Sequence, residues 1–103
     1  MEGISRIDKV VMQLDVWPDA ELVPFAKMKV KVIERSTGDF FATTNVHRRN
    51  PRSREPEYVG GLGDSIEEAV EDLLSRFVAD LRENSPGEGF TDSDFGWSAY
   101  EDF

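Results

Sequence analysis

The fold of this chain is decided by residues 60–74, GGLGDSIEEAVEDLL, which join a glycine-rich segment to the start of a helix. Ser65 is the expected N-cap, and Glu68, three residues later, completes a capping box. Asn84 and the Pro86-Gly87 pair end the helix. The sequence therefore predicts a helix over residues 66–83. Its apolar residues recur at spacings of three and four, which indicates one buried face: Ile66, Ala69, Val70, Leu73, Leu74, Phe77, Val78 and Leu81.

Three strands are predicted before this helix, because apolar and polar side chains alternate in residues 7–16, 25–35 and 40–47. Gly38 supplies the positive φ of a hairpin turn between the second and third strands. Residues 58–59 are predicted to add a short fourth strand. The predicted fold class is α+β: an antiparallel sheet of three to four strands with one long amphipathic helix packed on one face, in the order β-β-β-α.

The helix is expected to cover one face of this sheet, and the residues of that face are Val10, Met12, Leu14, Val16, Met28, Val30 and Val32. A single helix leaves the other face uncovered, and the apolar residues assigned to it are Val11, Ile33, Phe40 and Val46. We predict that this second face is covered either by the C-terminal residues or by a second copy of the chain, as a homodimer.

The length of 103 residues is enough for one domain with one core. We assign residues 1–84 to a single α+β domain and residues 85–103 to an acidic, aromatic C-terminal tail. There is no cysteine, no apolar run long enough to span a membrane, and no signal-peptide pattern at the N-terminus. The expectation is a cytoplasmic protein without membrane association.

The formal net charge is −9, and it is unevenly distributed. Residues 64–84 carry seven acidic and two basic side chains, and residues 85–103 carry five acidic and none basic. Such a charge repels nucleic-acid phosphates and attracts basic partners. It is also typical of a surface that only aids solubility, or of a salt-loving host, since lysine is scarce. Charge alone leaves these interpretations open.

Two segments are candidates for binding a partner. The first is the polar loop 48–57, with Arg48, Arg49, Arg52 and Arg54; these side chains are suited to nucleic-acid phosphates, to the chain's own acidic tail, or simply to water. The second is the tail, whose aromatic residues are costly to leave in water: Phe95, Trp97, Tyr100 and Phe103. A row of lysines in the second strand, Lys27, Lys29 and Lys31, adds either a solvated face or a second basic surface.

No catalytic residue, cofactor or metal site is predicted, so the chain is interpreted as a non-enzyme. His47 is the only histidine, there is no cysteine thiol, and His47 cannot supply a zinc site alone. The glycines at 60–63 do not match a phosphate-binding loop, because its lysine is missing. Glu67 and Glu68 at the helix start would also repel a phosphate.

The residues Gly63-Asp64-Ser65 and Glu67-Glu68-Ala69, following three strands, resemble the signature of the HicB-like antitoxin family. The resemblance covers residues 7–83 in element order. It implies a bacterial or phage protein whose domain masks a small basic RNA-cleaving toxin. The tail stands where that family often has a DNA-binding module, which puts DNA binding in doubt. The expected function is therefore a small acidic interaction module for a basic partner. The alternatives are weak nucleic-acid binding through the lysine face and arginine loop, or an acidic DNA mimic.

Overall fold

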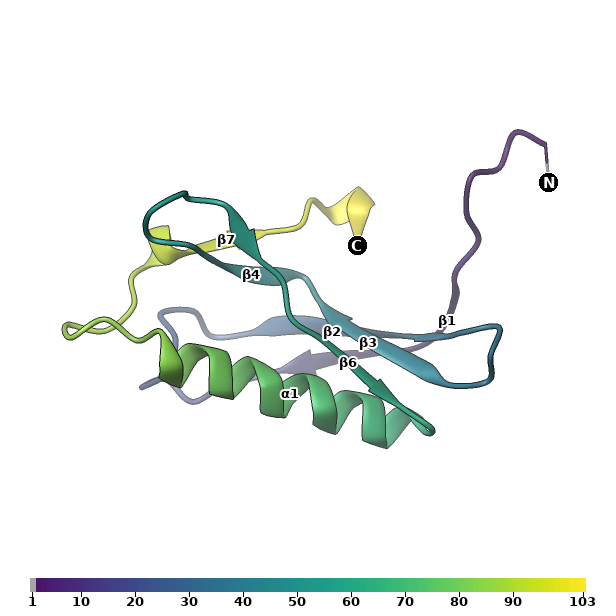
Figure 1. Cartoon of the computed structure of the whole chain (residues 1–103), viewed down its shortest axis with the longest axis horizontal. Coiled ribbons are helices and arrows are strands. Elements are labelled where there is room, and N and C mark those ends of the chain that lie inside the picture. Colours follow the sequence, from purple (N-terminus) through teal and green to yellow (C-terminus); the bar gives the residue numbers. More distant parts are fainter. Residues whose placement is uncertain (1) are drawn as a thin grey trace.

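The computed structural model describes residues 2–103, which form two antiparallel sheets and one long helix (Figure 1). This confirms the α+β fold class. None of the helices in the described part of the chain is long and apolar enough to cross a membrane. The elements are β1 (Lys9–Val16), β2 (Met28–Glu34), β3 (Phe40–Thr44), β4 (Val46–Arg49), β5 (Pro56–Glu57), β6 (Gly60–Gly63), α1 (Ile66–Glu83), β7 (Phe95–Trp97) and two short 3₁₀ helices, Asp92–Asp94 and Tyr100–Asp102.

The larger sheet has the strand order β1-β2-β3-β6, and α1 crosses one of its faces. The smaller sheet has the order β5-β4-β7. The predicted hairpin joins β2 and β3, with Gly38 at a φ of +89°. The third predicted strand is in fact divided, because β3 and β4 are separated by Asn45 and belong to different sheets.

Asn45 is the point at which the chain passes from one sheet to the other. Its side-chain Oδ1 accepts a hydrogen bond from the backbone N–H of Lys29 (2.9 Å), and its own N–H donates to the Lys29 carbonyl (3.2 Å). Its carbonyl accepts from the N–H of Ser98 (2.8 Å). Asn45 therefore makes hydrogen bonds both to β2 and to the C-terminal residues.

The predicted helix is confirmed from Ile66 to Glu83. The hydroxyl of Ser65 accepts a hydrogen bond from the N–H of Glu68 (3.1 Å), as expected of the N-cap. The carboxylate of Glu68 accepts from the N–H of Asp64 (2.9 Å) instead of from Ser65. One backbone donor in the first turn and one just before the helix are thus satisfied, although not in the reciprocal pattern of a capping box.

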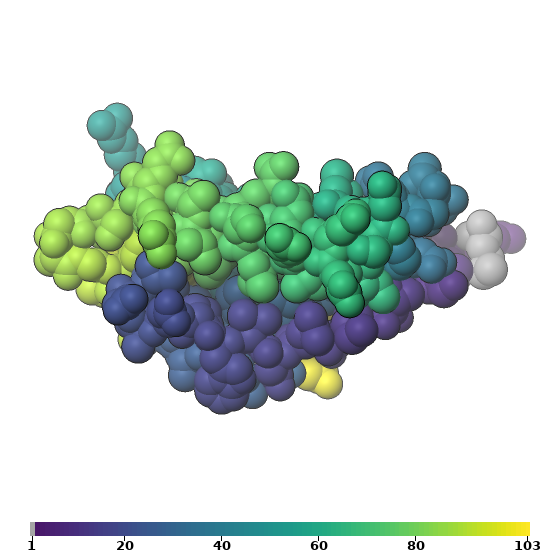
Figure 2. Space-filling model, turned by 90° about the horizontal axis from the view of Figure 1, so that it is seen from below, coloured from purple at the N-terminus to yellow at the C-terminus, as the bar shows by residue number. Residues whose placement is uncertain are grey.

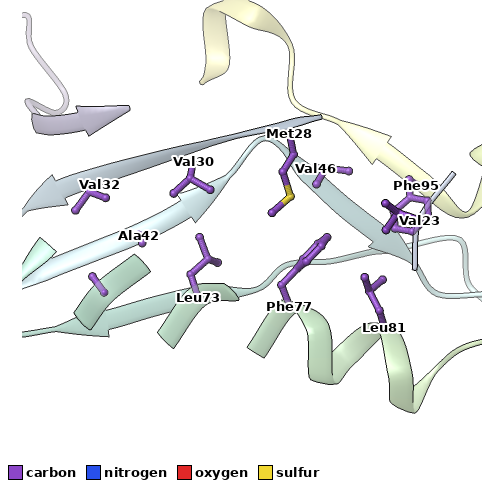
Figure 3. Close-up of a cluster of buried hydrophobic side chains, with 11 residues drawn as sticks. Val23, Met28, Val30, Val32, Ala42, Val46, Leu73, Phe77, Leu81 and Phe95 are labelled. Atoms are coloured by element: carbon purple, nitrogen blue, oxygen red, sulfur yellow. The ribbon is translucent and has the colours of Figure 1, made fainter. Parts of the chain in front are cut away.

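The core lies between α1 and the helix-facing side of both sheets (Figure 3). Ala69, Leu73, Phe77 and Leu81 are the buried residues of the helix. They meet a row of buried residues from the strands and the loop before β2: Val23, Met28, Val30, Val32, Ala42, Val46 and Phe95. Burying side chains of this size is worth about 1.5–3 kcal/mol each, which makes this layer the main source of stability.

The strand that precedes the helix was predicted at residues 58–59 and instead consists of the glycines themselves, Gly60–Gly63. It pairs with β3, so that α1 lies directly against its backbone. A Cβ atom added at Gly61 would overlap the backbone nitrogen of Leu73 and the carbonyl oxygen of Ala69. Close helix approach therefore explains Gly61 and Gly63, at which an added Cβ would overlap α1.

The prediction for the two faces of the larger sheet was wrong at several positions. Val10 pairs with Ile33 and Met12 with Val32, so a register shift in β1 moves Val10 to the face opposite Met12. Phe40 and Val46 were assigned to that opposite face, but both pack with the helix-side core, and Val11 also packs against it. A period-2 pattern does not reveal a bulge, so the face assignment failed at this point.

The remaining strand limits also differ from the predictions. The first strand begins at Lys9 instead of residue 7, and the second begins at Met28 instead of residue 25. The segment 48–57, predicted as a polar loop, contributes its first two residues to β4 and Pro56–Glu57 to β5. Residues 95–97 of the predicted tail form β7, and Phe95 lies in the core.

Candidate functional site

The pairing of β4 with β7 brings four of the predicted binding residues together. Arg48 lies opposite Phe95, and both are buried, at 8% and 5% exposure. Trp97 lies opposite Val46 and remains 46% exposed. Arg49 is on the other face of β4, where a Cβ at Gly96 would overlap its guanidinium. Two of the four residues therefore belong to the core, and two reach the surface on different faces.

Arg48 forms a two-point ion pair with the helix. Its Nε lies 2.8 Å from Oδ2 of Asp80, and its Nη2 lies 3.1 Å from Oδ1. The hydrogen bonding of the Arg48 guanidinium to the Asp80 carboxylate, which accepts, raises the pKa of Arg48 above its usual value. Because both donors are engaged and the side chain is buried, Arg48 fastens β4 to α1 and is not available to a partner.

The arginine loop is organised by Asn50. The side-chain Oδ1 of Asn50 accepts hydrogen bonds from the N–H groups of Arg52 (2.9 Å) and Ser53 (3.2 Å). Arg54 follows with a φ of +63°, and its guanidinium donates to the carbonyl of Ser93 in the C-terminal segment. Arg54 therefore connects the loop to the C-terminal residues. Arg52 is exposed to solvent, whereas Arg48 is buried.

The lysine row of the second predicted strand does not form a free basic face either. The ammonium groups of Lys27 and Lys29 lie 3.9 and 3.7 Å from the carboxylate of Asp15 on β1. Lys31 is only 8% exposed; its Nζ donates to the carbonyl of Phe103 (2.7 Å) and lies 4.6 Å from the centre of the Phe103 ring. Lys31 is thus held inside the molecule, whereas Lys27 and Lys29 remain exposed and share the single carboxylate of Asp15.

The aromatic residues of the tail separate into distinct environments. Phe95 and Trp97 both contact the Phe25 ring edge-on, with centroid separations of 5.2 and 4.9 Å. Phe103 covers Lys31 on the sheet face opposite the helix, which places part of the C-terminal segment on the face predicted to need a cover. Tyr100 is 95% exposed. Of the predicted aromatic set, only Trp97 and Tyr100 present a large free surface.

His47 lies on the outer face of the smaller sheet, against Tyr58 at a ring separation of 5.1 Å. Burial, and secondarily the positive charge of Arg49, lower its pKa below the usual value. Within residues 2–103 its Nδ1 has no hydrogen-bond partner, and no group of three or more acidic or histidine side chains is placed to hold a metal ion. The geometry around His47 offers no nucleophile in hydrogen-bond contact with it.

A shallow basin of about 550 Å³ lies on the sheet face opposite α1. It contains Lys31, Phe41, Tyr58 and Phe103, together with charged residues at its rim. The rim charges pair with each other: Lys9 lies 2.9 Å from Glu34, and other basic residues meet nearby carboxylates in the same way. The basin therefore has no dominant charge that would select a ligand.

A second groove, of about 510 Å³, lies between β1 and the first half of α1; we call it the β1–α1 groove. Sequence reasoning missed it, because the whole apolar stripe of the helix was assigned to the core. The stripe has two rows, and only the row of Ala69 and Leu73 is fully buried. The groove is lined by the other row and by the outermost strand: Met12, Leu14, Ile66, Glu67, Val70, Glu71, Leu74 and Ser75.

The basic and acidic side chains of the molecule differ in how many of them have a partner. Most basic side chains are engaged, either with carboxylates or with backbone carbonyls. Glu67 and Glu71, beside the β1–α1 groove, are exposed and form no ion pair within the described residues. Part of the unbalanced negative charge therefore lies along the first turns of α1, where the helix dipole stabilises it.

Comparison with known protein families, with curated proteins and with solved structures finds no match to this chain.

Proposed function

We propose that this chain is a non-enzymatic interaction module that binds a basic protein, in the way an antitoxin masks its target. The observation that carries the proposal is the combination of free carboxylates and apolar groups on one surface. Glu67 and Glu71 stand beside a groove lined by Met12, Val70 and Leu74. An apolar centre with a charged rim is the usual composition of a protein interface, and an acidic rim selects a basic partner.

The arrangement of the basic residues argues against the nucleic-acid alternative. A phosphate-binding surface needs several cationic groups that are free and on one face. Here Arg48 is buried against Asp80, Arg54 donates to Ser93, and Lys31 donates to Phe103. The exposed cations that remain in the arginine loop are too few to offset the net charge of −9 at long range.

The HicB-like resemblance remains a prediction, and so do the cytoplasmic location and the lack of enzymatic activity. An acidic DNA mimic would also bind a basic protein, so this alternative concerns the identity of the partner. The two are separated by competition. Duplex DNA displaces a mimic from its partner, whereas an antitoxin-like module keeps an RNA-cleaving partner inactive in the presence of DNA.

The proposal is tested by using the full chain as bait in nuclease-treated lysate of its source, and then titrating each retained protein after purification. We expect a basic protein that forms a stoichiometric complex, with an affinity that falls as salt rises. A truncation at Asn84 is unsuitable, because it removes Phe95 from the core.

The matched control is the double substitution Arg49→Ala and Arg52→Ala, which removes the two arginines of the loop whose side chains form no ion pair or hydrogen bond within the described residues. Retention of the basic protein should be unaffected by it. Retention that requires nucleic acid and is lost in this variant would contradict the proposal and support the alternative. Retention of proteins no more basic than the lysate as a whole would also contradict it.

A further inference from the structure

We infer that the β1–α1 groove binds an extended, basic and amphipathic segment of the partner, which adds to the larger sheet as a new strand beside β1. The inference deepens the proposed function and takes the basic character of the partner from it. It assigns the binding to one edge of the sheet and one half of the helix (Figure 2), where β1 and the loop after it lie alongside α1.

The β1 edge of the larger sheet is exposed. β1 is the outermost strand of the larger sheet and pairs with β2 alone among the described residues. Its outer N–H and C=O groups are therefore open to another strand. An added strand would satisfy these groups by main-chain hydrogen bonds, which is how extended peptides augment a sheet.

An apolar surface lies next to that edge. Met12 is 39% exposed, although its side chain is on the helix side of the sheet with Val32. Leu14, Val70 and Leu74 are half-buried around it. In an added strand, every second side chain would point to the helix side and could fill the groove, while the others would point away. This requires apolar residues in the helix-facing row of the partner strand.

The charge at the helical wall of the groove favours a basic partner over a second copy of the chain. Glu67 and Glu71 are exposed at the helical wall of the groove and have no ion-pair partner in the described part of the chain. Two copies that paired through β1 would bring two such walls together and place like charges side by side. Lysine or arginine in the helix-facing row of the added strand, beside the apolar residues of that row, would instead neutralise them.

The inference is tested with a synthetic peptide of the length of β1, labelled for fluorescence anisotropy, in which leucine and lysine share the helix-facing positions, every second residue, with threonine between them. We expect saturable binding by the full chain, with amide chemical-shift changes along β1. A peptide with glutamate in place of lysine, and one of the same composition without alternation, are the probe controls. The absence of saturable binding by the alternating lysine peptide would overturn the inference.

Two protein variants locate the binding. Met12→Lys places a positive charge in the groove and should weaken binding of the lysine peptide by about tenfold or more. Val10→Lys is the matched control, because Val10 is similarly exposed, at 46%, in the same strand but on the opposite face. Equal loss in the two variants would overturn the inference, and circular dichroism of each variant verifies that it is folded.

The rim is tested by neutralising Glu67 and Glu71 to Gln, which should weaken the lysine peptide by about fivefold. Glu88→Gln with Glu101→Gln changes the net charge equally, away from the groove, and should leave the affinity nearly unchanged. An equal effect of both pairs would show that only net charge matters and would overturn the assignment of the site.

Failure here is distinguishable from failure of the proposed function. If a basic protein is retained from lysate but Met12→Lys does not weaken its binding, the proposed function stands and the groove is the wrong site. If the chain alone is a dimer by light scattering and Met12→Lys dissociates it, the groove is occupied by a second copy and the inference is overturned. If no basic protein is retained, the proposed function itself fails.

Discussion

The two edges of the larger sheet meet the same helix in opposite ways. At the β6 edge, Gly61 and Gly63 have no side chain, and the backbone of α1 lies directly on the strand. At the β1 edge, Met12 and Leu14 project from the strand, and a groove separates them from Val70 and Leu74. One edge of the sheet is therefore closed by contact, and the other is left open.

The difference shows that the glycines determine where the helix sits, and not only how the chain turns. A helix packs closest where the opposing side chains are smallest, so α1 is drawn toward β6 and away from β1. Arg48 and Asp80 fasten its later turns on the same side. The groove at β1 is a consequence of this offset, because one helix cannot cover four strands from a position over one edge.

The largest expected effect comes from filling the closed edge. Gly61→Leu introduces a side chain where the backbone of Leu73 and Ala69 already lies, so the helix must move or the protein must unfold. We expect a loss of about 3 kcal/mol or more in the free energy of unfolding, measured by chemical denaturation. Gly87→Ala is the control, because nothing lies near its added Cβ. Equal effects would show that close helix approach at β6 is unimportant.

A pair of truncations measures the contrast between the edges directly. Leu73→Ala removes a fully buried side chain beneath the helix and should cost about 3 kcal/mol. Met12→Ala removes a side chain that is 39% exposed at the open edge and should cost less than about 1 kcal/mol. Both values come from denaturation midpoints at a constant slope. A large cost for Met12→Ala in the isolated chain would mean that the open edge is already closed.

The ion pair between β4 and α1 should contribute a smaller effect. Asp80→Asn keeps the shape of the side chain but leaves the buried guanidinium of Arg48 without its carboxylate. Because the Asp80 side chain is 24% exposed, we expect a loss of about 2 kcal/mol, below the range for a fully buried pair. Thermal unfolding measures it. Recovery of stability in the double variant Arg48→Met and Asp80→Leu would identify the unpaired charge as the cause.

The smallest effect is the pH dependence of the closed edge. The carboxylate of Asp72 on α1 accepts a hydrogen bond from the N–H of Leu62 in β6 (3.0 Å), and this bond, followed by that from Arg76, lowers the pKa of Asp72. A lowered pKa in the folded chain means that the stabilisation is complete above the usual pKa of aspartate. It is lost as the pH falls through the folded value.

This dependence is measured by following the Leu62 amide signal and the stability of the chain as the pH is lowered. Asp72→Asn should remove the low-pH change in the Leu62 signal. Glu71→Gln, at the preceding position of the helix, should leave that change in place. A titration of Leu62 that is unchanged in Asp72→Asn would contradict the assignment.

Much of the architecture could be predicted from local patterns. The helix limits followed from its apolar spacing, from Ser65 as the N-cap and from the stop after Glu83, since these signals act within a few residues. The α+β class followed from the alternation in the strands. The face of Val10 could not be predicted, because a bulge in β1 depends on its pairing with β2 and leaves no periodic signal.

The candidate binding residues show the same limit. The sequence grouped Arg48 with Arg52 because they are close along the chain, but β4 turns Arg48 inward to Asp80 while Arg52 stays at the tip of a loop. It also grouped Phe95 with Tyr100, although one is 5% and the other 95% exposed. Neighbours in sequence alternate in direction along a strand, so proximity along the chain does not establish a shared surface.

The sequence by itself determined the helix, the strand-rich first half, and an excess of negative charge on the residues from 64 onward, because propensity, capping and charge are local properties. Only the tertiary structure decided which apolar residues are covered. It placed the helix over Gly61 and Gly63, turned Arg48 into the core, and left Met12 and Leu14 exposed beside Glu67 and Glu71. Coverage depends on how closely two elements approach, and that distance is determined by side chains that are far apart in the sequence.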